Sequence, residues 1–141
     1  MTATPPYRYF EHTADLGLEI FGDTAEELFA NAGRGLFDTI AAATARTGKQ
    51  QEDITVTGAD LPDLLVNWLR ELLALWTVDG RLMAAADILF LTKTELRARL
   101  HWDHFDPARH VLATEVKAVT YHGLTVEKTD RGWRGRVVLD V

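Results

Sequence analysis

Two amphipathic helix patterns, both before residue 80, constrain the fold more than any other feature of the chain. The first begins with Thr24, which is followed three residues later by Glu27 in a capping box. Apolar residues then recur every four positions, at Leu28, Ala32, Leu36 and Ile40. This spacing predicts a helix with one face in the core.

The second pattern begins at Asp60 or Leu61, either of which can cap a helix that tolerates Pro62 in its first turn. Its apolar stripe is wide and comprises Leu64, Leu65, Trp68, Leu69, Leu72, Leu73 and Trp76. We therefore expect the second helix to be largely buried, with these aromatic residues in core packing.

Strand-like segments surround the helices and then fill the rest of the chain. Before and between the helices they are residues 7–12, 16–21 and 54–58, and after them residues 88–91, 96–104, 111–122, 124–128 and 133–141. Residues 41–53 are small and polar, which is typical of a helix end followed by a loop. The order predicts one α+β domain over residues 1–141, with two helices packed on a mostly antiparallel or mixed sheet.

Composition excludes several classes of protein. The 141 residues contain no cysteine and no serine, so disulfides, thiolate chemistry and a Ser-His-Asp triad are impossible. A net charge of −6 argues against binding nucleic acid directly, which usually needs a basic face. Neither a signal peptide nor an apolar run long enough to span a membrane is present, so we expect a cytoplasmic protein.

The two ends of the chain carry the strongest functional signal. Asp140 follows an apolar run and precedes Val141, so the C-terminus reads as a docked final strand. Asp15 lies in the connection between the first two strand patterns. If the ends meet, Asp15, Asp140 and the terminal oxygens of Val141 form an oxygen-rich corner suited to a hard divalent cation. The alternative is that Asp15 is only a turn former and Asp140 only a surface residue.

Other polar clusters are less specific. His101 and His104 are three apart, which on a strand places them on opposite faces and disfavours one shared metal. In a strand, Glu115 and Lys117 would share a face and could pair with charges of a partner, although a solvated ladder is the commoner arrangement.

Several motifs together resemble the archease family, in order and over nearly the whole chain. They are the string His12-Thr13-Ala14-Asp15, the helix start at residues 26–29, the helix at residues 63–73, Arg109-His110, the run from Glu115 to His122, and the closing Leu139-Asp140-Val141. One departure is His101-Trp102-Asp103-His104, where the family commonly has a Gly-Glu pair; Asp103 is then the candidate replacement.

The resemblance implies a protein cofactor, not an enzyme. Archeases assist the RtcB-type RNA-splicing ligase, which joins RNA ends using GTP and Mn²⁺ through a guanylylated histidine. They promote this guanylylation and multiple turnover, in tRNA splicing and RNA repair. Carried over by motif, Asp15, Asp140 and Val141 would bind one divalent cation (Ca²⁺, Mg²⁺ or Mn²⁺). Arg109, Glu115 and Lys117 become candidates for contacting the ligase.

Two other functions fit the same residues. A small metal-dependent phosphohydrolase would hold its ion with Asp15 and Asp140 and use His12 or His122 as general base. A chaperone-like binding module would show an exposed apolar patch and no metal. The oligomeric state and the dependent RNAs do not follow from the sequence.

Overall fold

The computed structural model describes residues 4–11 and 15–141. Within these residues the chain forms two helices and seven strands. In chain order they are β1 (Tyr7–Glu11), β2 (Leu16–Gly22), α1 (Ala25–Ile40), β3 (Gln50–Thr57), α2 (Leu61–Asp79), β4 (Arg81–Leu91), β5 (Glu95–His104), β6 (Ala118–Thr129) and β7 (Gly132–Asp140).

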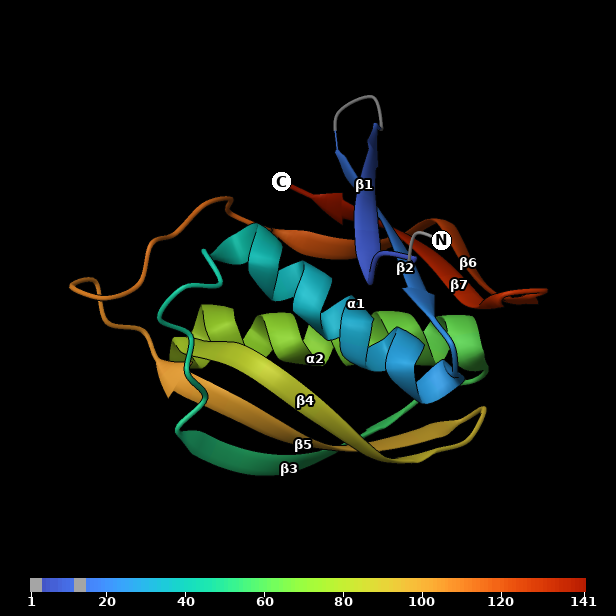
Figure 1. The fold of residues 1–141 in the computed structure, drawn as a ribbon, viewed down its shortest axis with the longest axis horizontal. Helices are drawn as coiled ribbons and strands as arrows, with labels where there is room; N and C mark the ends of the chain where they lie inside the picture. Colours follow the sequence, from blue (N-terminus) through green and yellow to red (C-terminus); the bar gives the residue numbers. More distant parts are fainter. Residues whose placement is uncertain (1–3, 12–14) are drawn as a thin grey trace.

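The two helices form a middle layer between two antiparallel sheets (Figure 1). One sheet has the order β1-β2-β7-β6 and the other the order β3-β5-β4. Each sheet turns one face to the helices, so the core runs through all three layers and includes the fully buried Leu18, Phe29, Trp68 and Leu100. The α+β prediction is confirmed, but the strands form two sheets and not one.

Local signals in the sequence place both helices. Thr24 caps α1 by accepting a hydrogen bond from the backbone N–H of Glu27 at 3.1 Å. Asp60 caps α2 in the same way through Asp63, at 2.9 Å. Gly80 ends α2 in the left-handed conformation, with φ of 67°, where a glycine is favoured. Among the described residues, no helix combines the length and apolar character needed to cross a bilayer.

The last strand of the chain occupies an interior position in the larger sheet. β7 pairs with β2 on one side, where Leu16 lies opposite Leu139, and with β6 on the other, where Ala118 lies opposite Asp140. The prediction of a docked C-terminal strand is confirmed. This topology brings the N-terminal and C-terminal regions of the chain together.

Four predicted segments differ in the structure. Residues 111–117 are not a strand, because their backbone groups bond to the end of α1, as described below. Residues 124–128 are not a separate strand but part of β6, whose pairing with β7 is irregular between Thr120 and Thr125 around Gly123, where φ is 65°. Strands β3 and β4 begin earlier than predicted, at Gln50 and Arg81.

Candidate functional site

The register of β2 and β7 brings the two candidate aspartates to the same end of this strand pair. Asp15 immediately precedes Leu16 and Asp140 immediately follows Leu139, and these two leucines lie opposite each other. Asp15 is a bend residue just outside β2, so the two aspartates flank the last pair of this ladder. Both aspartates are partly exposed, and Val141 is 37% exposed beside them.

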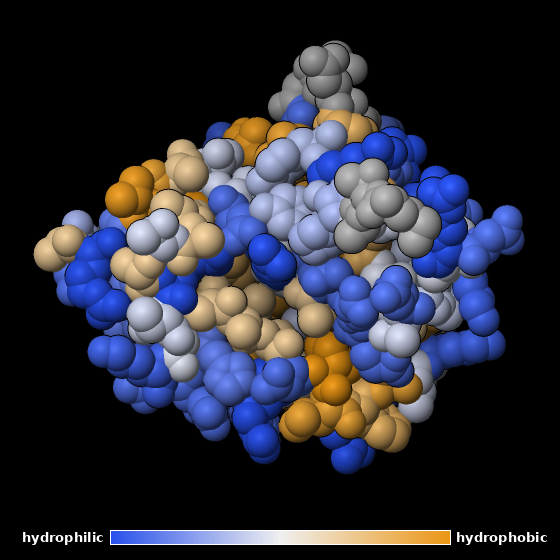
Figure 2. All heavy atoms as spheres, viewed as in Figure 1, coloured by the Kyte–Doolittle hydropathy of each residue, from blue (hydrophilic) through white to orange (hydrophobic). Residues whose placement is uncertain are grey.

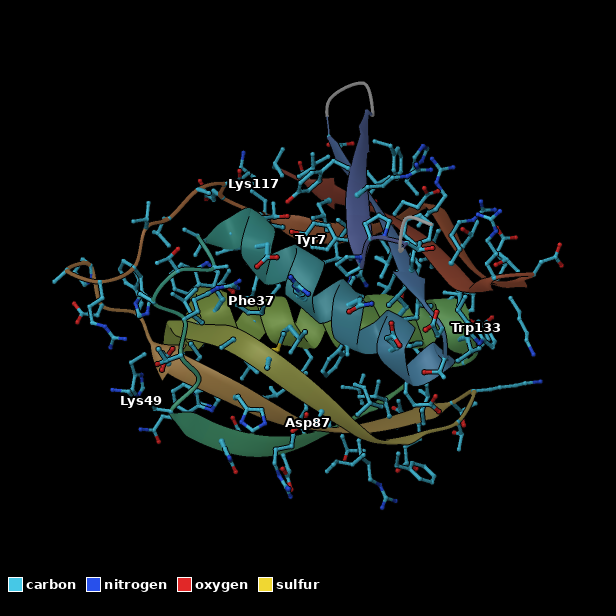
Figure 3. All side chains as sticks on the ribbon, in the orientation of Figure 1. Tyr7, Phe37, Lys49, Asp87, Lys117 and Trp133 are labelled. Carbon is cyan, nitrogen blue, oxygen red and sulfur yellow. The ribbon has the colours of Figure 1, made fainter. Side chains whose placement is uncertain are left out.

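The segment of residues 105–117, here called the 105–117 loop, leads directly into this corner. The backbone N–H of Lys117 donates to the carbonyl oxygen of Asp140 at 2.7 Å, and β6 begins at the next residue. The side chain of Lys117 is exposed, at the C-terminal end of α1 in Figure 3. A candidate partner-binding residue therefore adjoins a candidate metal-binding one.

The 105–117 loop is irregular but firmly anchored. Ala113 and Thr114 donate their backbone N–H groups to the carbonyl oxygens of Ile40 and Thr39, at 2.8 and 3.1 Å. These carbonyls lie in the last turn of α1, where no intrahelical donor remains for them. Capping a distant helix end is the physical reason that this segment leaves the sheet.

His110 anchors the middle of the loop and is only 5% exposed. Its Nδ1 accepts the backbone N–H of Asp106 at 2.9 Å, so the proton of the neutral ring lies on Nε2, which faces the carbonyl oxygen of Ala45 at 3.2 Å. Arg109 donates to the same oxygen at 3.3 Å while its side chain stays exposed. Arg109 is therefore presented to solvent on a fixed backbone.

The remaining candidates fall in different places. Glu115 is exposed in the 105–117 loop and, like Lys117, lies outside any strand, so the prediction that the two share a strand face is wrong. His122 is exposed in the irregular part of β6, away from the pairing of Ala118 with Asp140. His12 lies outside the described residues.

Asp103, the candidate replacement for a family acidic residue, has a structural role. It is 5% exposed, and its carboxylate accepts the backbone N–H groups of Thr47, Gly48 and Lys49 at 2.6–3.1 Å. Burial acts to raise its pKa, but the bonds from these three amides outweigh it and lower the pKa. Asp103 therefore fixes residues 47–49 over the end of β5.

Sequence reasoning missed the second anchor of this region. Arg46 has a side chain only 4% exposed; it pairs with Asp38 and donates to the carbonyl oxygen of Met83 at 3.1 Å. Tyr7 donates to the same Asp38 carboxylate at 2.8 Å, and burial together with this bond raises the pKa of its phenol. An arginine in a small, polar segment gave no signal of burial.

The oxygen groups of the corner suit a hard cation, but they are too few to complete its coordination. In the described part of the chain, no group of three or more His, Cys, Asp or Glu side chains is arranged to hold a metal ion. Two aspartate carboxylates and a terminal carboxylate would offer oxygen ligands, the type that Ca²⁺, Mg²⁺ and Mn²⁺ prefer. Such an ion takes six or more ligands, so the remaining positions would be left to water or to groups of a partner.

Comparison with known proteins identifies the family. The model of the archease protein family matches residues 7–141. The chain belongs to the archease family. Archeases from Methanosarcina mazei and Methanopyrus kandleri are each 37% identical over 139 residues; the match covers 96% of this chain and 95% and 99% of the two relatives.

Solved structures show the same archease fold. The solution structure of Methanobacterium thermoautotrophicum protein 1598 superposes with a TM-score of 0.80 at 26% identity, covering 96% of this chain and 99% of that one. The crystal structure of a Thermotoga maritima archease, described as a possible chaperone, gives a TM-score of 0.62 at 21% identity and covers 100% and 98%. At 21% identity the likeness concerns the fold alone.

Proposed function

We propose that this archease is a protein cofactor of an RtcB-type RNA-splicing ligase and promotes guanylylation of the ligase histidine. One observation supports this most directly. The pairing of Leu16 with Leu139 brings Asp15, Asp140 and the last residue of the chain to the same end of the larger sheet. The 105–117 loop leads into β6 at this end. A metal-binding element and a docking element are thus parts of one surface.

The chain's own residues would act in two ways. Asp15, Asp140 and the Val141 carboxylate would hold a divalent cation, which supplies positive charge close to the bound partner. Arg109, Glu115 and Lys117 are exposed on an anchored backbone, so little conformational entropy is lost when they pair with charges of the ligase. GTP and the catalytic Mn²⁺ belong to the ligase, and this chain performs no catalysis itself.

The decisive experiment measures guanylylation. Purified archease is mixed with its cognate ligase, GTP and Mn²⁺, and the rate of ligase labelling and the number of ligation turnovers are followed. A faster rate and multiple turnover are expected only with archease present. Equal rates with and without it would contradict the proposal.

A chaperone-like role is the second candidate, because several large apolar side chains are exposed. Leu89 and Phe90, which are 52% and 41% exposed, lie on β4, where hydrophobic residues gather at the lower edge of the molecule (Figure 2). Such a role would depend on this apolar surface and not on the carboxylates. The double variant Leu89→Lys and Phe90→Lys would then no longer stimulate guanylylation of the ligase. The metal-corner proposal expects the same variant to stimulate guanylylation normally.

A further inference from the structure

A cavity of about 550 Å³ lies at the opposite end of the larger sheet from Asp140. Four parts of the chain line it: residues 4–6, the corner between β2 and α1, residues 27–34 of α1, and the turn between β6 and β7. Its volume falls in the range of small-molecule sites. In Figure 3, Trp133 lies by this cavity near the start of α1, while Lys117 lies near the other end of the helix.

Two glycines hold together the chain segments on either side of the cavity. A Cβ atom on Gly132 would lie 2.5 Å from the carbonyl oxygen of Gly22, and one on Gly22 would lie 2.4 Å from the backbone nitrogen of Leu28. Gly132 also has φ of 125°, which other residues rarely adopt. The backbone of the β6–β7 turn therefore packs directly on the backbone of the β2–α1 corner. This contact fixes the distance between the two sides of the cavity.

The walls combine flat apolar surface with guanidinium groups. Trp133 provides an aromatic ring, and Pro5 and Pro6 add apolar surface. Phe21 also lines the cavity, but it lies opposite Arg134 and so on the other face of the sheet from Trp133. The basic side chains on the wall are Arg34, Arg131 and Arg134. Arg134 is paired with Glu127, with an Nε to Oε1 distance of 3.0 Å. The side chain of Arg34 is 61% exposed, and its ion pair with Asp38 is long, at 3.7 Å.

Carboxylates and guanidinium groups are interspersed along the wall. Asp23, Glu27 and Arg34 belong to the β2–α1 corner and α1, whereas Asp130, Arg131 and Arg134 belong to the β6–β7 hairpin. The cavity therefore presents carboxylate acceptors, guanidinium cations and an aromatic ring. A ligand that matches all three has a planar ring, N–H donors on its edge and an anionic group.

We propose that this cavity binds a nucleoside phosphate, with the base against Trp133 and the phosphate on Arg131 and Arg34. Aromatic rings stack on any base, and arginine binds phosphate through charge-assisted hydrogen bonds. Asp23 and Glu27 accept hydrogen bonds from the amino group of the base. The phosphate can belong to a free nucleotide or to the end of a single-stranded RNA, since the recognised chemistry is the same.

The overall charge does not oppose this site. A net charge of −6 disfavours binding along a nucleic-acid backbone, but the cavity wall is locally balanced, with Arg34, Arg131 and Arg134 against the carboxylates of Asp23, Glu27 and Asp130. The cavity is also separate from the acidic corner. Residues 16–20 of β2 lie between Asp15 and Phe21, and these six steps at about 3.3 Å per residue give a separation of about 20 Å.

The test uses the full chain labelled with ¹⁵N, titrated in amide-correlation NMR spectra and in tryptophan fluorescence. Four probes are compared: adenosine 5′-monophosphate, adenosine, inorganic phosphate, and a five-nucleotide single-stranded RNA with a 3′-phosphate. We expect saturable shifts confined to residues 21–34 and 129–134. Arg131→Ala and Trp133→Leu should each weaken binding about tenfold. Arg97→Ala, which removes a 57% exposed guanidinium from the other sheet, should leave binding unchanged.

Each outcome decides the proposal. Equal affinity for the mononucleotide and the RNA supports a free nucleotide as ligand, and tighter binding of the RNA supports an RNA end. Inorganic phosphate binding as tightly as the mononucleotide, shifts centred on Asp15 and Asp140, equal effects of Arg131→Ala and Arg97→Ala, or no saturation at millimolar probe would each overturn it. None of these measurements involves the ligase, so the inference and the proposed function can fail separately.

Discussion

Lys117 donates its backbone N–H to the carbonyl oxygen of Asp140 at 2.7 Å, and this one bond connects the two parts of the proposed functional surface. On one side of it the 105–117 loop is fixed to the end of α1, and on the other the C-terminal strand is fixed between β2 and β6. The orientation of the exposed loop residues is therefore coupled to the position of the carboxylates.

Removing either carboxylate should abolish stimulation of the ligase without unfolding the protein. Asp15→Asn and Asp140→Asn preserve side-chain size at partly exposed positions, so the free energy of unfolding should change by less than about 1 kcal/mol. Affinity for a divalent cation depends on ligand charge and should fall sharply. Guanylylation rates at saturating archease and calorimetric titration with Ca²⁺ and Mn²⁺ check this. Full turnover with both variants would show that the corner is not the mechanism.

Extending the chain beyond Val141 should weaken cation binding. Two extra glycine residues move the terminal carboxylate away from the corner and leave a neutral amide in its place. The matched control places the same two residues before Met1. Calorimetry should show weaker binding only for the C-terminal extension, and identical affinities would mean that the free terminus is not a ligand.

Changes in the 105–117 loop should affect docking and not the saturated rate. Glu115→Gln and Lys117→Ala alter exposed side chains whose expected partners lie on the ligase. More archease should then be needed for half-maximal guanylylation, with the maximum retained. Glu95→Gln, at the start of β5 on the other sheet, is the control. A lowered maximum would place Glu115 or Lys117 in the chemistry and not in docking.

Loss of the Asp103 carboxylate should destabilise the protein in a pH-dependent way. Asp103→Asn removes the charge that accepts three backbone N–H groups and should cost about 2 kcal/mol at pH 7. The folded state lowers the pKa of Asp103, so this stabilisation is present above the ordinary aspartate pKa of about 3.9 and is lost as pH falls through the lower folded-state value. Urea denaturation of both proteins from pH 7 to pH 2.5 should show the difference shrinking below about pH 4.

The control is Asp130→Asn, which changes the same chemical group at an exposed turn. Its unfolding free energy should track that of the unchanged protein across the whole range. A difference between the Asp103 variant and the unchanged protein that stays constant down to pH 2.5 would mean that packing, and not the charge of Asp103, is responsible.

Short-range signals in the sequence were sufficient for the helices but not for the pairing of strands. Thr24 and Asp60 lie within three residues of the amides they cap, so local chemistry predicts both helix starts. Residues 111–117 were wrongly predicted as a strand, because Ala113 and Thr114 bond to carbonyls more than 70 residues earlier in the chain. Alternation of apolar residues does not reveal such partners.

The candidate sites also combine features with a local signal in the sequence and features that depend on long-range pairing. Asp15 and Asp140 were marked by their flanking residues, but their placement at the same end of a strand pair depends on β2 pairing with β7, which no local pattern specifies. The cavity beside Trp133 gave no signal in the sequence, since it depends on Gly22 and Gly132 meeting across the fold. Glycines at these two strand ends read only as ordinary turn residues.

The interior position of β7 has a consequence for the order of folding. Until β7 is in place, the edges of β2 and β6 have no neighbour to join them. The larger sheet can therefore close only once the last strand in chain order is available. A chain cut before Gly132 would have exposed strand edges and no acidic corner.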